Sequence, residues 1–193
     1  MNTLLSFAAT LVSLRVAGPL VRSRRYAWGA GVLAFGAATG ALAWGSAHGW
    51  DAPSFRLYYL AGALLSAPLL GVGSLSLAGR RWGPPLGLLY AGFAVGIAIA
   101  MPLRGTFGET TVPRAQDHVD TLERVIAIVA SSLGTIAVVA VALATLRRRP
   151  VGNALVVAAV AAAAAASVLT QTAVAAAAVL FALAAALLYG AVR

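Results

Sequence analysis

Seven stretches of apolar residues, separated by short polar segments, constrain this chain more than any other feature. A helix needs roughly 20 such residues, within a range of about 17–25, to cross the hydrocarbon core of a bilayer. Inside that core, backbone N–H and C=O groups can pair only within helices or closed barrels. We therefore expect an all-α, polytopic transmembrane helix bundle that forms a single domain over residues 1–193. The predicted spans are residues 2–20, 27–47, 57–78, 84–103, 125–146, 151–169 and 173–191.

The composition indicates that lipid is the solvent for most side chains. Hydrophobic residues make up 61% of the chain, charged residues make up 10%, and the mean hydropathy is +0.91. A soluble domain has about 45–50% apolar and about 25% charged residues. The net charge of +9 would suit nucleic acid, but the arginines lie in short clusters between apolar stretches. We expect a lipid bilayer as partner and no nucleic acid.

The arginine clusters predict how the chain is oriented. They follow alternate apolar stretches, at Arg22, Arg24, Arg25, Arg80, Arg81, Arg147, Arg148, Arg149 and Arg193. Because cytoplasmic loops carry the excess of basic residues, we expect the N-terminus outside and the C-terminus inside. The expected location is the inner (plasma) membrane of a bacterium, whose anionic inner leaflet would face the arginines. All five acids then lie on the outer side, at Asp51, Glu109, Asp117, Asp120 and Glu123.

Arg15 interrupts the first apolar stretch, and no basic region precedes it, so we expect a retained helix and not a cleaved signal peptide. A charge inside a span indicates a functional site by default. An arginine near a helix end can also extend its head group to the membrane surface. We favour the second interpretation, because Arg15 lies only about two turns from Arg22.

Absent residue types exclude several chemistries. Without cysteine there are no disulfides, thiolate metal sites or cysteine nucleophiles. All 14 basic residues are arginine, so no lysine amine can form the Schiff base of a retinal-linked rhodopsin. No acid lies within a predicted span, which disfavours a carboxylate relay for protons or sodium. No Walker, HExxH or GxSxG motif occurs. We expect no enzyme activity, no cofactor and no metal.

The span over residues 57–78 is richest in polar features. Pro68 interrupts its backbone hydrogen bonds. Ser66, Ser74 and Ser76 would line a cavity at the freed carbonyls, or each would bond its own carbonyl four residues earlier. The candidate ligand-binding residues are Trp50, Tyr58, Tyr59, Ser66 and Pro68.

A second candidate set lies in the long connection between the fourth and fifth spans, at Arg114, Asp117, His118 and Asp120. Carboxylates and imidazoles bind metals, but this spacing matches no metal-site signature. Asp120 and Glu123 have the spacing of a capping box, which we favour.

Long loops without helical periodicity are commonly functional or disordered, and Pro113 favours order here. We expect residues 104–124 to fold back as a lid near Trp50 and Tyr58. Arg114 would pair with Asp51 or Asp117 across this lid. A ligand would enter beneath it, facing Tyr59 and Ser66.

Small residues predict close helix packing in two places. Residues 151–169 and 173–191 are dominated by alanine and joined by a very short turn, so we expect an antiparallel hairpin. Glycines spaced four apart occur as Gly36 and Gly40, Gly83 and Gly87, and Gly92 and Gly96. We expect these pairs to serve packing within the chain and not a dimer.

Three sequences carry a resemblance to known proteins: FRLYYLAGALLSAPLLGVGSLSLAGRR, MPLRGTFGETTVPR and LRRRPVGNALVVAAV. Together they resemble uncharacterised seven-helix integral membrane proteins of GC-rich bacteria, a group with no known activity. The third span, with its central Pro68, loosely resembles the third helix of the seven-helix sensor regions that precede some bacterial histidine kinases. These 193 residues include no kinase domain, so we expect from this likeness that a signal would pass to another membrane protein.

Three classes of function remain open on the sequence. The first is a receptor-like or accessory protein that binds a ligand or partner without catalysis. The second is a transporter or channel for a small neutral solute or a lipid. The third is a structural subunit of a larger membrane complex. The absence of charge inside the spans disfavours the second class, and we expect the first.

Overall fold

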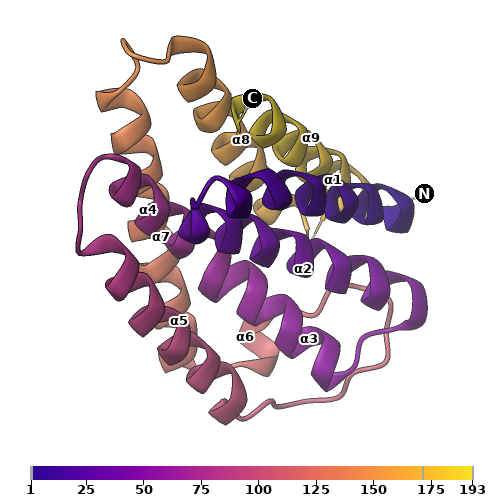
Figure 1. Cartoon of the computed structure of the whole chain (residues 1–193). Coiled ribbons are helices and arrows are strands. Elements are labelled where there is room, and N and C mark those ends of the chain that lie inside the picture. The colour runs from indigo at the N-terminus through magenta and orange to yellow at the C-terminus, as the bar shows by residue number, and fades with distance from the viewer. Residues whose placement is uncertain (1, 171, 193) are drawn as a thin grey trace.

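The computed structural model describes residues 2–170 and 172–192, and every regular element in these ranges is helical (Figure 1). Seven helices are long and apolar enough to cross a membrane, which confirms the all-α, multi-span architecture. Six of them are continuous: α1 (Asn2–Arg22), α2 (Tyr26–His48), α5 (Gly83–Ala100), α7 (Thr121–Ala144), α8 (Pro150–Leu169) and α9 (Val174–Val192). The third span joins α3 (Ala52–Tyr58), the π-helical segment η1 (Tyr59–Ser66) and α4 (Ala67–Leu77). A short helix, α6 (Ala115–His118), lies before α7.

Two predicted boundaries differ from the structure for identifiable reasons. The third span begins at Ala52 because Asp51 and Ser54 form a capping box. The Ser54 N–H donates to Asp51 Oδ1 at 2.8 Å, and the Asp51 N–H donates to Ser54 Oγ at 3.1 Å. The fourth span ends at Ala100 because Met101 is extended, as a residue before Pro102 prefers to be.

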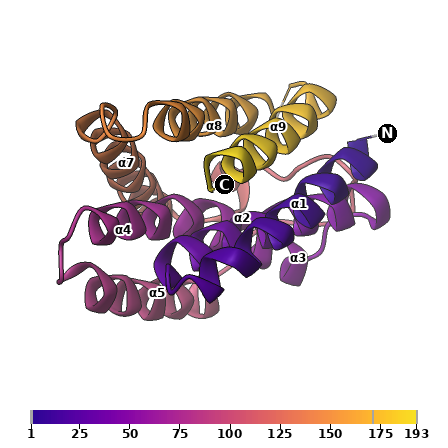
Figure 2. The same ribbon diagram turned by 45° about the horizontal axis from the view of Figure 1, so that its top comes forward.

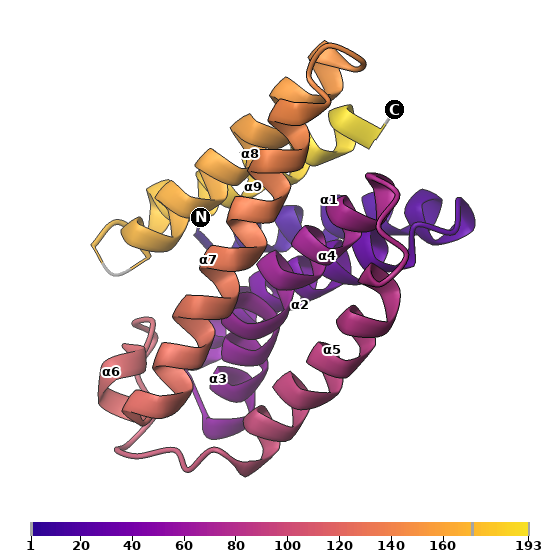
Figure 3. The same cartoon turned by 90° about the vertical axis from the view of Figure 1, so that its left-hand side faces the viewer.

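Helix α2 is at the centre of the bundle. It packs against α1, α3, η1 and α4. In Figure 2, α4, α2 and α1 form a row with α7, α8 and α9 on one side and α3 and α5 on the other. We call the end with the α5–α7 connection the loop end, and the end with the arginine-bearing connections the arginine end. In Figure 3 the loop end is at the lower left, where α6 lies beside the start of α7.

Helices α8 and α9 form the antiparallel hairpin that their alanine content predicted. A Cβ built on Gly190 would lie 3.3 Å from Leu155 Cδ1, and one on Gly152 would lie 3.4 Å from the Ala191 carbonyl oxygen. Ala166 on α8 is fully buried. The small side chains therefore permit close contact along the whole pair.

The predicted glycine pairs divide into two kinds. A Cβ on Gly36 would lie 3.1 Å from Ser13 Cβ on α1, and one on Gly87 would lie 3.0 Å from Val72 on α4. These pairs serve packing within the chain, as expected. The pair on α5 does not, because Gly92 and Gly96 have no neighbour within 4 Å of a built Cβ.

The π-helical segment η1 ends just before Pro68, and two hydroxyl groups complete its hydrogen bonding. A carbonyl in π geometry pairs with the N–H five residues later, and one in α geometry with the N–H four residues later. Pro68 has no N–H, so it can serve neither Ala63 nor Leu64. Ser131 of α7 donates to the Ala63 carbonyl at 2.6 Å, and Tyr90 of α5 donates to the Leu64 carbonyl at 2.6 Å. Neighbouring helices thereby stabilise the irregular backbone of the third span.

The serines of this span bond within their own helix. Ser66 donates to the Gly62 carbonyl at 2.7 Å, and the hydroxyl groups of Ser74 and Ser76 bond in the same i−4 pattern. Gly71 lies against α7, where a built Cβ would be 2.7 Å from Gly134 Cα. The structure therefore supports the second of the two interpretations given above, in which each serine bonds to a carbonyl of its own helix.

Arg15 lies on the exposed surface of α1. Within residues 2–170 and 172–192, the ion pair that forms is between Arg104 and Asp120, and Arg15 takes part in none. This placement fits a side chain that extends along the helix towards the membrane surface.

Candidate functional site

The α5–α7 connection, residues 101–120, is closed on itself by polar contacts. The Arg104 N–H donates to the His118 carbonyl at 3.0 Å, and His118 Nδ1 lies 2.7 Å from the Arg104 carbonyl oxygen. Because a carbonyl oxygen can only accept, Nδ1 carries the proton and donates. The Arg104 guanidinium also pairs with the Asp120 carboxylate at 2.9 Å. These contacts join the two ends of the connection.

Two expectations for this connection were wrong. Asp120 does precede α7, but its side chain makes no capping hydrogen bond. Its carboxylate pairs with Arg104 instead, and the folding of the loop brings that arginine within reach. Arg114 pairs with neither Asp51 nor Asp117, since Arg104–Asp120 is the ion pair found across the described residues. Arg114 is exposed where α6 begins.

The connection folds back onto the turn between α2 and α3, near Trp50 as expected. The Trp50 backbone N–H donates to the Glu109 carbonyl at 2.9 Å. Gly49 beside it has a positive φ of 88°, and a built Cβ would lie 2.9 Å from the Gly108 carbonyl oxygen. Glycine is therefore required for this close approach of two backbones.

Aromatic rings hold the connection against α3. The Phe107 and His118 rings are stacked with centroids 4.5 Å apart, and each lies 5.5 Å from the Phe55 ring. Phe55 is 1% exposed, so this contact belongs to the core of the loop end. The connection is therefore anchored by apolar packing as well as by hydrogen bonds.

A small cavity lies between this connection and the α2–α3 turn, and we call it the loop pocket. Its volume is about 240 Å³. It is lined by Trp50, Thr106, Phe107, Gly108, Glu109, Thr111, Pro113 and His118. Glu109 is the acid among these residues, and its carboxylate accepts a hydrogen bond from the Thr111 hydroxyl at 2.8 Å. The pocket thus combines aromatic rings, hydroxyl groups and one carboxylate.

Trp50 supplies the most unusual feature of the loop pocket. The residue is 2% exposed, and its indole Nε1 is buried without a hydrogen-bond partner among residues 2–170 and 172–192. Its ring packs against Tyr58 with centroids 5.3 Å apart, and a Cβ on Gly45 would lie 2.5 Å from the ring. Leaving a buried donor unpaired costs about 1–3 kcal/mol. Pairing of this N–H with an acceptor would recover that free energy.

The other residues of the first candidate set lie at two different depths. Tyr59 is buried near the loop end, and its hydroxyl donates to the Glu123 carbonyl at 3.2 Å. Ser66 and Pro68 follow it along the same span, roughly 20 Å from Ala52 at about 1.5 Å per residue. They therefore do not share the loop pocket with Trp50.

Phe107 and Glu109 line the loop pocket but were not among the candidate site residues, and Glu123 was expected only as part of a capping box. Glu123 lies in the first turn of α7, and its Oε2 atom is buried without a partner. The sequence feature that could have indicated the pocket is Phe107, an aromatic residue between Gly105 and Gly108 in a loop. Within residues 2–170 and 172–192, no three His, Asp or Glu side chains gather as a metal site.

Asp51 shows the clearest electrostatic perturbation outside the spans. The Ser54 side chain and then the Ser54 backbone N–H, which donates to Asp51 Oδ1 at 2.8 Å, hold the pKa of Asp51 below its ordinary value of 3.8. The carboxylate is fully exposed, so its role is to fix the start of α3.

Fold and site together define a seven-span helical membrane bundle with one small pocket, built by a connecting loop, at one end. No family model matches this chain, and neither a curated protein nor a solved structure matches it.

Proposed function

We propose that this chain is a receptor-like binding protein that takes a small water-soluble ligand into the loop pocket and performs no catalysis. The carrying observation is the buried, unpaired indole N–H of Trp50. Buried polar groups are nearly always hydrogen-bonded, and an exception calls for an explanation such as a missing partner. A ligand with an acceptor atom is that partner.

The proposal includes an orientation. The connections at the arginine end carry eight arginines between Arg22 and Arg149, and basic residues mark the cytoplasmic side. The loop end then faces outwards from a bacterial inner membrane, and the arginines face the anionic inner leaflet. A ligand from outside the cell would reach the loop pocket without crossing the bilayer.

Ligand entry requires the connection to move, because Trp50 is almost fully covered. Opening would break the hydrogen bond of the Trp50 N–H to the Glu109 carbonyl and the contact of Phe107 with Phe55, whereas the ion pair at the ends of the connection adds little resistance. Asp120 and Arg104 have side chains 33% and 70% exposed, and such exposed pairs contribute about 0–1 kcal/mol. The aromatic contact of Phe107 with Phe55 would restore the closed form after binding. A bound ligand would hold the loop against α3 and thereby pass its signal to the bundle and to a partner membrane protein.

The test is a thermal-shift screen of the purified protein in lipid nanodiscs. The probes are amino acids, simple sugars, short carboxylates and small amines, measured against the wild type, Trp50→Phe and the matched control Trp44→Phe. Trp44 is 58% exposed on α2 and does not line the loop pocket. We expect at least one probe to raise the melting temperature of the wild type and of Trp44→Phe, and to raise that of Trp50→Phe much less. Equal stabilisation of all three proteins, or of none, contradicts the proposal.

A further inference from the structure

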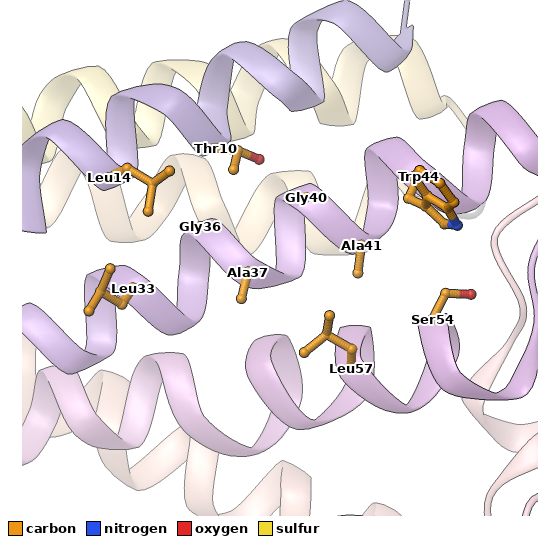
Figure 4. Close-up of a pocket in the computed structure, with 10 residues that line it drawn as sticks. All are labelled: Thr10, Leu14, Leu33, Gly36, Ala37, Gly40, Ala41, Trp44, Ser54 and Leu57. Carbon is orange, nitrogen blue, oxygen red and sulfur yellow. The ribbon is translucent and has the colours of Figure 1, made fainter.

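A second cavity lies on the side of the bundle, away from the loop pocket. It is an open groove of about 480 Å³ along α2, between α1 and α3 (Figure 4), and we call it the α2 groove. Small residues of α2 form its floor, and side chains of α1 and α3 form its walls. The lining residues are Thr10, Leu14, Leu33, Gly36, Ala37, Gly40, Ala41, Trp44, Ser54 and Leu57.

The two hydroxyl groups that line the α2 groove are already paired. The Thr10 hydroxyl donates to the Ser6 carbonyl at 3.0 Å and lies 3.0 Å from the Thr39 hydroxyl. The Ser54 hydroxyl is engaged with Asp51 in the capping box of α3. No charged residue lines the groove. Apart from the Trp44 indole at the loop end of the groove, the polar side chains there are already paired, so an occupant of the rest of the groove must be apolar.

The length and depth of the groove match one leaflet of a bilayer. Leu33 and Trp44 mark its two ends on α2, and eleven residues of helix rise about 16 Å. That is about half of the roughly 30 Å hydrocarbon core. Trp44 lies near the loop end of α2, and its exposed ring stacks on His48 with centroids 4.2 Å apart. Tryptophan favours the membrane surface, so the groove runs from that surface to the middle of the bilayer.

The shape of the groove favours a single flexible chain over a helix of a second copy. Gly36 and Gly40, which would suit helix dimerisation, already face Ser13 and Thr10 of α1 within the chain. Ten residues line the groove, whereas a stable protein interface uses about 20–30 residues on each side. Side chains of α1 and α3 border the groove on both sides (Figure 4).

We propose that the α2 groove is a binding site for one acyl chain of a phospholipid from the leaflet at the loop end. The chain lies over Ala37, Gly40 and Ala41, and the head group lies beside Trp44 and His48. The site is separate from the loop pocket, and it does not depend on the function proposed for that pocket. Burial of each CH₂ group in the groove replaces contacts with mobile lipid by contacts with a fixed surface.

Native mass spectrometry of the protein extracted in mild detergent tests this proposal. Ala37→Leu fills the floor of the groove, and Gly92→Leu is the matched control because Gly92 faces open space on α5. We expect one phospholipid per chain on the wild type and on Gly92→Leu. On Ala37→Leu the bound fraction should fall about tenfold, because the larger side chain takes up the space of the acyl chain and removes its packing contacts with the floor of the groove. Full lipid occupancy on Ala37→Leu, or a wild-type dimer that Ala37→Leu dissociates, overturns the proposal.

A second measurement uses the wild-type protein and therefore does not depend on how a variant folds. The probe is a phosphatidylcholine with a photoreactive diazirine in one acyl chain, reconstituted with the protein in nanodiscs. Leu14, Leu33 and Leu57 of the groove are each 42–50% exposed, while Leu88 and Leu89 of α5 are 76% and 74% exposed. We expect cross-links to concentrate on the three groove residues. Cross-linking that follows exposure, and so favours α5, contradicts a specific site.

Discussion

Replacing Tyr90 by phenylalanine removes the hydroxyl that donates to the Leu64 carbonyl at 2.6 Å. Leu64 is fully buried, and Pro68 has no N–H to offer that carbonyl. An unpaired buried acceptor costs about 1–3 kcal/mol, and hydrogen bonds between membrane helices contribute about 0.6 kcal/mol on average and about 1.7 kcal/mol at most. We therefore expect Tyr90→Phe to lower the free energy of unfolding by about 1–2 kcal/mol.

The same substitution should cost less when Pro68 is replaced by alanine. The N–H of an alanine at this position can donate to the Leu64 carbonyl four residues earlier, so the Tyr90 hydroxyl becomes redundant. In the Pro68→Ala background we expect Tyr90→Phe to cost less than about 0.5 kcal/mol, which gives a coupling of about 1 kcal/mol between the two sites. Tyr26→Phe is the control, because Tyr26 is 62% exposed at the arginine end.

The assay is equilibrium unfolding by SDS in mixed micelles, followed by circular dichroism, for the wild type, both single variants and the double variant. A cost of Tyr90→Phe that is the same with and without Pro68 would refute the reasoning. The hydroxyl would then stabilise the bundle by some means other than replacing the N–H that proline lacks.

Three further predictions concern single positions. Gly134→Ala should destabilise the fold by about 1–3 kcal/mol in the same assay, because a built Cβ lies 2.6 Å from the Pro68 backbone nitrogen, while Gly92→Ala on open α5 should cost nothing measurable. Because the pKa of Asp51 is lowered in the folded state, its carboxylate stabilises the fold fully above pH 3.8, and this stabilisation is lost as the pH falls through the folded-state pKa. The NMR resonance of the Ser54 amide should shift in that acidic range, and Asp51→Asn should abolish the shift. Arg15→Leu should change the free energy of unfolding by less than about 0.5 kcal/mol, and a loss above about 2 kcal/mol would indicate a buried partner.

The seven helices could be predicted from the sequence because each apolar stretch is long enough to cross a bilayer. Inside lipid, the backbone N–H and C=O groups of such a stretch must be paired, and a helix pairs them. Sequence reasoning misplaced helix starts where polar residues extend a helix beyond its apolar part. Asp51 and Ser54 show this, since their reciprocal hydrogen bonds add a turn that hydropathy cannot reveal. Asp120 shows the opposite error. Its capping-box spacing was present, but Arg104, 16 residues away, took its carboxylate.

The candidate site was only partly predictable for a similar reason. Trp50 and Tyr58 were named as aromatic residues near the membrane surface, and His118 as a possible metal ligand in the long connection. In the structure Trp50 packs against Tyr58 and lines the loop pocket with His118. The pocket itself depends on long-range pairings, such as that of the Trp50 N–H with the Glu109 carbonyl, which no local pattern encodes. Ser66 was grouped with them because it shares their span, yet the rise of the helix places it deep in the bundle.

We propose that the bundle presents its loop pocket on the outside of the cell. Cysteine labelling in intact cells measures this orientation directly. The natural chain has no cysteine, so single cysteines report without background. Gln116 is exposed on α6 at the loop end, and Gly152 lies in the first turn of α8 at the arginine end. With a membrane-impermeant maleimide, we expect Gln116→Cys to react in intact cells and Gly152→Cys to react only after the cells are permeabilised. Reaction of Gly152→Cys in intact cells, with Gln116→Cys protected, would place the loop pocket in the cytoplasm and contradict the account.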